Sequence, residues 1–153
     1  MNKIYFDIAA TTPIDPDVMI YMNLVQESTF GNPSSVHRFG QESRATIERA
    51  RRQVAKALNC MPKEIIFTGG GSESNNIVLQ GFLSDGDHLI TSSYEHPAVL
   101  KVANELQKIG VEVTYVKPNS SGLIVATDIE KSIKKNTKLI SIMYVNNEIG
   151  TIN

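Results

Sequence analysis

The sequence is poor in several residue types that mark particular classes of protein. Cys60 is its single cysteine among 153 residues, which excludes an internal disulfide framework and indicates a reducing compartment, by default the cytoplasm. The three histidines lie far apart without partners at ligand spacing, so no metal site is expected. A formal net charge of −1 predicts neither nucleic acid nor an anionic membrane as a partner. No apolar run approaches the roughly 20 residues of a membrane helix.

The sequence does contain an alternation of short apolar runs and helical patterns. The apolar content is 41% and the charged content 20%, as in a soluble globular domain. The alternation predicts an α/β fold with a mostly parallel sheet and helices on both faces. The expected strands are Glu64–Thr68, His88–Thr91, Glu112–Val116 and Leu139–Met143, and the expected helices are Asp15–Val25, Gly40–Leu58, Ser72–Leu83, Pro97–Ile109 and Thr127–Lys134.

A run of three glycines follows the first expected strand and opens a helix. Gly69 to Gly71 let the backbone turn sharply and approach a ligand, because no Cβ is present. The helix that begins at Ser72 presents free N–H groups and the positive end of its dipole there. The run is neither a Walker loop nor a G-x-G-x-x-G fingerprint. It therefore favours a small phosphorylated ligand over a nucleotide, although an ordinary strand-to-helix connection rich in glycine is the alternative.

Polar segments follow the other strands as well. Parallel sheets bind ligands beyond the carboxyl ends of their strands, so His96, Asn146 and Asn147 are expected near the glycine run. His96 could lie flat on an aromatic ring or move protons, or it could only cap a helix. The two amides could contact a carboxylate or a phenolic oxygen, or they could be loop formers. Cys60, at the opposite edge, is expected to be a packing residue and no nucleophile.

The chain is expected to divide into an N-terminal arm, residues 1–39, and a larger α/β region, residues 40–153. Pro and Gly punctuate the arm, which is expected to pack over the sheet edge or over a neighbouring subunit. Only four strong strands are present, so one flank of the sheet would stand open. The sequence therefore reads as the front portion of a larger protein.

Five motifs follow one another along the chain. They are Asp7-x-Ala9-Ala10-Thr11-Thr12-Pro13, Phe30-Gly31-Asn32-Pro33-Ser34-Ser35-x-His37, Thr68-x-Gly70-x-Ser72-Glu73-Ser74-Asn75-Asn76, Glu95-His96 and Val145-Asn146-Asn147-Glu148-Ile149-Gly150. Together they resemble cysteine desulfurases of the NifS/IscS type, which belong to the class V aminotransferase family of fold-type I enzymes dependent on pyridoxal phosphate (PLP). The resemblance implies that residues 40–153 are the first, incomplete part of the PLP-binding large domain.

The resemblance implies a role for individual residues. Gly71 and Ser72 would hold the cofactor phosphate, and His96 would stack on the pyridine ring and assist proton transfer. Asn147 would contact the phenolic oxygen of the cofactor and the substrate, and Thr12 would lie on the substrate side. The complete protein would be a cytoplasmic homodimer that converts L-cysteine to L-alanine. It would pass the sulfur, as an enzyme persulfide, to a scaffold for Fe–S cluster assembly or to a tRNA-thiolation enzyme.

Several functional residues of that family have no counterpart here. No lysine follows a histidine, as the Schiff-base lysine would, and Cys60 does not match the sulfur-accepting cysteine. The 153-residue chain alone is therefore expected to be inactive. Two alternatives stay open: a portion of a selenocysteine lyase or of another class V aminotransferase, or a non-catalytic binding or dimerisation module.

Overall fold

The computed structural model describes residues 4–153, which form two compact units. The first unit ends at Phe67 and the second is Thr68–Asn153. The two units are described separately below. The expected division into an arm and a larger domain stays a prediction.

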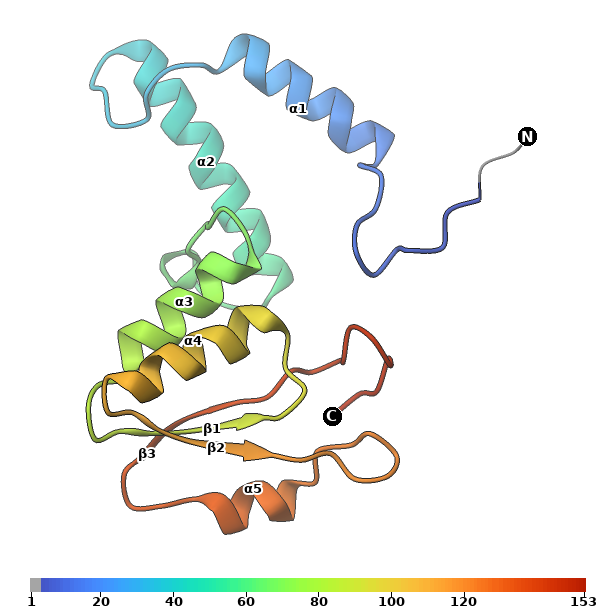
Figure 1. Ribbon diagram of the computed structural model, residues 1–153. Coiled ribbons are helices and arrows are strands. Elements are labelled where there is room, and N and C mark those ends of the chain that lie inside the picture. The colour runs from blue at the N-terminus through green and yellow to red at the C-terminus, as the bar shows by residue number, and fades with distance from the viewer. Residues whose placement is uncertain (1–3) are drawn as a thin grey trace. The chain divides into compact units, whose positions relative to one another are not determined.

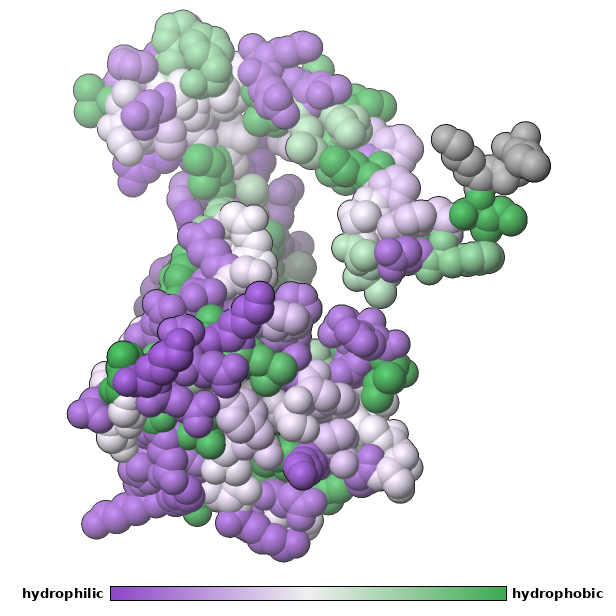
Figure 2. All heavy atoms as spheres, in the orientation of Figure 1, coloured by the Kyte–Doolittle hydropathy of each residue, from purple (hydrophilic) through white to green (hydrophobic). Residues whose placement is uncertain are grey.

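Within residues 4–67, the first unit consists of two helices and a short 3-10 turn. Helix α1 (Pro16–Ser28) begins after Asp15, whose carboxylate accepts hydrogen bonds from the backbone N–H groups of Asp17 and Val18. Helix α2 (Arg38–Ala57) is followed by the 3-10 turn η1 (Pro62–Glu64). Gly31 is required before α2, because a Cβ there would lie 2.3 Å from a backbone oxygen. In Figure 2, hydrophobic side chains are interspersed with polar ones along α1, which buries none of its residues.

The second unit is a three-layer α/β structure. Its three described strands are all parallel, in the order β2-β1-β3. Figure 1 shows α3 and α4 on one face of this sheet and α5 on the other, which confirms the predicted fold class. The elements are α3 (Gly71–Phe82), β1 (His88–Ser92), α4 (Pro97–Lys108), β2 (Glu112–Val116), α5 (Ala126–Ser132) and β3 (Thr137–Ser141).

The central strand β1 is buried along its whole length and divides the core in two. Successive side chains of a strand point to opposite faces, so Leu89 and Ile90 belong to different clusters. Leu89 packs under α3 and α4 in the larger cluster. Ile90 packs with Val116 and Ile124 on the face that α5 covers. The larger cluster contains Leu79, Leu83, Leu89, Val99, Val102, Ala103, Leu106 and Val111.

One predicted strand is wrong. The segment Glu64–Thr68 is extended at Ile65, with φ −94° and ψ 125°, but pairs with no strand among residues 4–153. The guanidinium of Arg51 donates to the carbonyl of Ile65 and lies 5.0 Å from the ring of Phe67. Apolar β-branched residues set the extended conformation locally, but a strand requires a neighbouring backbone with free N–H and C=O groups.

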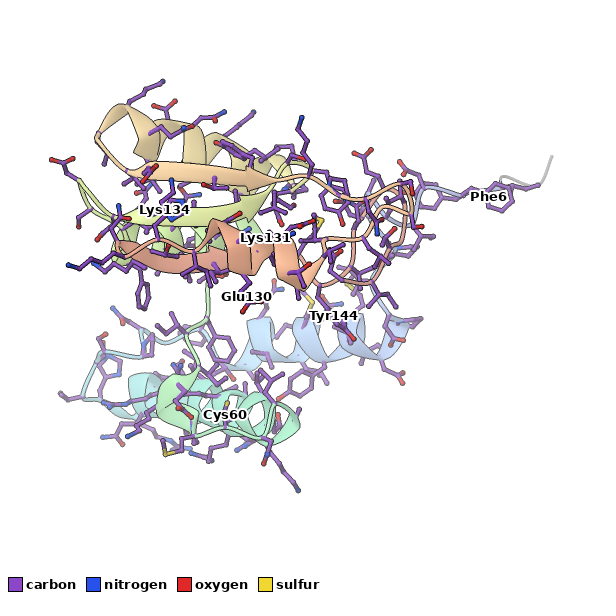
Figure 3. The ribbon with its side chains drawn as sticks, turned by 90° about the horizontal axis from the view of Figure 1, so that it is seen from below. Phe6, Cys60, Glu130, Lys131, Lys134 and Tyr144 are labelled. Atoms are coloured by element: carbon purple, nitrogen blue, oxygen red, sulfur yellow. The ribbon has the colours of Figure 1, made fainter. Side chains whose placement is uncertain are left out.

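The surface carries no membrane-spanning element among the described residues. None of the helices within residues 4–153 is both long and apolar enough to cross a bilayer. In Figure 3, Glu130 and Lys131 of α5 and the nearby Lys134 lie on the polar exterior of the second unit.

Candidate cofactor site at the carboxyl edge of the sheet

A hollow lies where the loops that follow β1 and β3 meet. Its volume is about 360 Å³, and its walls are Tyr94–Pro97 from the first loop and Asn146–Ile149 from the second. The two segments are about fifty residues apart in sequence, but β1 and β3 are adjacent parallel strands, so their carboxyl ends lie at the same edge. The structure therefore brings together His96, Asn146 and Asn147, as the sequence predicts.

His96 is both the N-cap of α4 and a wall of the hollow. Its Nδ1 accepts a hydrogen bond of 3.0 Å from the backbone N–H of Ala98, and the residue is otherwise exposed. The capping role considered from sequence is thus confirmed, and the functional role of His96 stays a prediction. An accepting Nδ1 leaves the proton of the neutral ring on Nε2. The cap therefore leaves Nε2–H as the donor that the neutral ring offers to a ligand.

Asn146 and Asn147 have different environments although they are neighbours in sequence. Asn146 is 4% exposed, and its Oδ1 accepts from the backbone N–H groups of Glu148 (2.9 Å) and Ile149 (3.0 Å). Its Nδ2 donates to the carbonyl of Tyr94 and to the sulfur of Met143. The amide of Asn146 is fully used within the protein. Asn147 is exposed and is the amide that a ligand could contact.

Asn153 and Tyr94 connect the loops further, and sequence reasoning missed both. The hydroxyl of Tyr94 donates to the carbonyl of Gly122 (2.8 Å) and lies 3.0 Å from Oδ1 of Asn153. Asn153 accepts from the N–H of Ile124 and donates to the carbonyl of Met143. All three loops beyond the strands are thus joined. Their position after strand ends is the one sequence signal that could have identified them.

Sequence reasoning also gave Glu95 no role of its own beside His96. It is 6% exposed, and its Oε1 accepts two hydrogen bonds of 2.8 Å, from the hydroxyl of Ser92 and from the backbone N–H of Met143. A carboxylate at such a depth needs donors around it. Ser92 is the last residue of β1 and Met143 lies two residues after β3, so the two donors come from the segments that lead into the two walls.

The glycine run precedes α3, whose first turn no side chain caps. A Cβ placed on Gly70 or Gly71 would meet nothing within 4 Å, so the space beside the backbone is open. Ser72 is exposed in this first turn, where the N–H groups of a helix have no intrahelical partner. Gly71 and Ser72 do not line the hollow itself.

The start of α3 nevertheless lies toward the same edge of the sheet. The helix ends at Phe82, a short turn before β1 begins at His88. Its 12 residues span about 18 Å, and the five residues of β1 span about 16 Å, so α3 runs the length of the strand. Figure 1 shows α3 and α4 side by side over the sheet. Both helices therefore begin on the carboxyl side.

Thr12 belongs to the first unit and is treated separately. It is exposed and lines a small hollow of about 270 Å³ with Tyr5, Thr11 and Pro13. Its role on the substrate side stays a prediction. Cys60 is half-buried after α2 in the same unit (Figure 3). Within residues 4–153, no group of three or more His, Cys, Asp or Glu side chains is placed to hold a metal ion.

Residues 4–153 match the aminotransferase class-V family. The chain belongs to this family. It is also similar to curated proteins named cysteine desulfurase IscS. The protein from Dictyoglomus turgidum is 47% identical over 99% of this chain and 39% of its own length, and that from Pseudomonas syringae pv. syringae is 49% identical over 98% and 39%. The chain thus spans about two fifths of the length of these relatives.

Solved structures resemble this class-V aminotransferase chain in fold. A NifS-like protein has a TM-score of 0.94 and 38% identity, with 99% of this chain and 43% of that chain covered. SspA, in a structure with cysteine, has a TM-score of 0.88 and 44% identity, with 97% and 44% covered. The cysteine desulfurase of Thermococcus onnurineus NA1 has a TM-score of 0.86 and 32% identity, with 97% and 38% covered.

The class-V aminotransferase chain has the residue types that a phosphorylated aromatic cofactor needs. Open backbone and a hydroxyl at Gly71 and Ser72 could take a phosphate dianion. The exposed imidazole of His96 could lie against a ring, and Asn147 could reach a polar ring substituent.

Proposed function

We propose that this chain provides the phosphate-holding and ring-stacking part of a PLP-dependent cysteine desulfurase. One observation carries the proposal: in a class-V aminotransferase chain, His96 and Asn147 line one hollow at the edge toward which the open start of α3 points. The names of the curated relatives and the cysteine in the SspA structure support cysteine as the substrate.

The whole protein would convert L-cysteine to L-alanine and retain the sulfur as an enzyme persulfide. It would act as a cytoplasmic homodimer and pass the sulfur to a scaffold for Fe–S cluster assembly or to a tRNA-thiolation enzyme. PLP, when bound, supplies an electron sink for the carbon skeleton of the substrate. The residues of this chain have to bind the cofactor, orient it and control protons around it.

Gly71 and Ser72 would hold the phosphate. The N–H groups of the first turn of α3 carry partial positive charge, and the hydroxyl of Ser72 adds a donor on the same side. No Cβ narrows the approach at Gly70 or Gly71. This arrangement recognises the phosphate independently of the ring, so the phosphate is expected to account for much of the affinity of this chain.

His96 and Asn147 would hold the ring. The cap on α4 holds the imidazole of His96 at the wall of the hollow, with the proton of the neutral ring on Nε2. The N–H at Nε2 is thus the donor that the neutral ring offers near the substrate, since the lone pair of Nδ1 accepts from Ala98. Asn147 would donate to the phenolic oxygen, while Asn146 holds the loop in place.

Pyridoxine 5′-phosphate is a suitable probe, because it lacks the aldehyde and cannot condense with surface lysines. We expect the chain to bind it at least about tenfold more tightly than pyridoxine, measured by isothermal titration calorimetry. Ser72→Ala should lower the affinity for pyridoxine phosphate several-fold and leave the affinity for pyridoxine unchanged. His96→Ala should lower the affinity for both compounds. Ser121→Ala, on an exposed loop, is the matched control. Equal affinity of the unsubstituted chain for the two compounds would refute the phosphate assignment.

A further inference from the structure

We propose that Glu95 is a positioning residue that clamps the two walls of the cofactor site together. The inference rests on the proposed function and adds to it a residue that does not itself touch the ligand. Glu95 immediately precedes His96 in the loop after β1, and the N–H that it binds belongs to Met143, at the start of the loop that presents Asn147.

The clamp depends on one oxygen atom. Oε1 of Glu95 accepts from the hydroxyl of Ser92 at 2.8 Å and from the backbone N–H of Met143 at 2.8 Å. The first bond fixes the carboxylate to the end of β1, where Ser92 is fully buried. The second bond fixes Met143, two residues beyond the end of β3, to that same side chain. Since Glu95 is only 6% exposed, water cannot easily replace either donor.

The other contacts between the walls are weaker or less direct. The amide of Asn146 reaches the carbonyl of Tyr94 at 3.3 Å, and Asn153 contacts the hydroxyl of Tyr94 at 3.0 Å. Both are longer than the bond from the backbone N–H of Met143 to Oε1 of Glu95, which measures 2.8 Å. Removal of Glu95 would leave Ser92 and Met143 with unpaired donors and would free the segment that leads from β3 into the second wall.

Hydrogen–deuterium exchange tests the clamp on the loop, with pyridoxine phosphate binding measured on the same proteins. We expect Glu95→Ala to accelerate exchange at residues 143–149 by about 10- to 100-fold, with β2 amides unchanged. The affinity for pyridoxine phosphate should fall about tenfold in parallel. Glu95→Gln should restore both properties to within about threefold, because its single carbonyl oxygen can accept both bonds. Glu105→Ala, on the exposed side of α4, is the control.

Each other result counts against the proposal. Equal acceleration in β2 would mean that Glu95 stabilises the whole unit and does not position the site. If Glu95→Ala accelerates exchange in the loop but leaves the affinity for pyridoxine phosphate unchanged, the ligand does not contact the wall that Glu95 holds. Failure of Glu95→Gln to restore the loop would show that the two bonds at Oε1 are not the cause. If the unsubstituted chain binds no pyridoxine phosphate, the proposed function fails, and the exchange pattern alone decides whether the clamp exists.

Discussion

Asn146 and Asn147 provide a sharp test, because adjacent residues of the same type are assigned opposite roles. Asn146→Ala removes two accepted backbone hydrogen bonds, at 2.9 and 3.0 Å, and two longer donated contacts. A net value of about 1 kcal/mol for each of the two short bonds, with a smaller contribution from the donors, predicts a loss of about 2–3 kcal/mol in the free energy of unfolding. Asn147→Ala removes an exposed side chain and should change the free energy of unfolding by less than about 0.5 kcal/mol.

Urea unfolding followed by circular dichroism measures both variants, and ligand titration completes the comparison. Asn147→Ala should weaken pyridoxine phosphate binding without loss of stability. Asn146→Asp retains both acceptor interactions but buries its second oxygen against the carbonyl of Tyr94 without a donor, so it should not restore the lost stability. A loss for Asn147→Ala as large as that for Asn146→Ala, or no loss for the latter, would refute the division of roles.

Two further predictions concern the edge of the sheet opposite the site. Gly110→Ala should lower the thermal midpoint by several degrees in a melt, since φ is +93° and the new Cβ would lie 1.9 Å from Oδ1 of Asp85; an unchanged midpoint would contradict this. The pKa of His88 is lowered from its ordinary 6.5, mainly by burial and also by Lys134, although Glu112 acts in the opposite direction. As the pH falls, the imidazole of His88 therefore takes up a proton in the unfolded chain before it does so in the folded chain. The free energy of unfolding should fall as the pH drops from about 7 toward 5. Urea unfolding at each pH should show a smaller dependence of this free energy on pH for His88→Gln.

Much of the fold follows from local sequence. Proline at Pro97 starts α4, which the structure ends at Lys108, one residue before the predicted end. The predicted strand Glu112–Val116 is observed with the same bounds. The last strand is shifted, to Thr137–Ser141 instead of Leu139–Met143, because its ends depend on which backbone groups β1 offers. The spacing of apolar residues and the helix signals decide such elements without reference to the rest of the molecule.

The sequence by itself determined the element types, the parallel sheet and the edge at which His96 and Asn147 meet, because hydrophobic periodicity and strand direction are local or topological properties. Only the tertiary structure decided that Ile65 pairs with no strand among residues 4–153, that Asn146 is structural while Asn147 is exposed, and that Glu95 joins the two walls. These outcomes depend on which donor lies within about 3 Å of which acceptor after residues some fifty positions apart have been brought together. Neither the composition of the chain nor the spacing of its residues specifies these donor–acceptor distances.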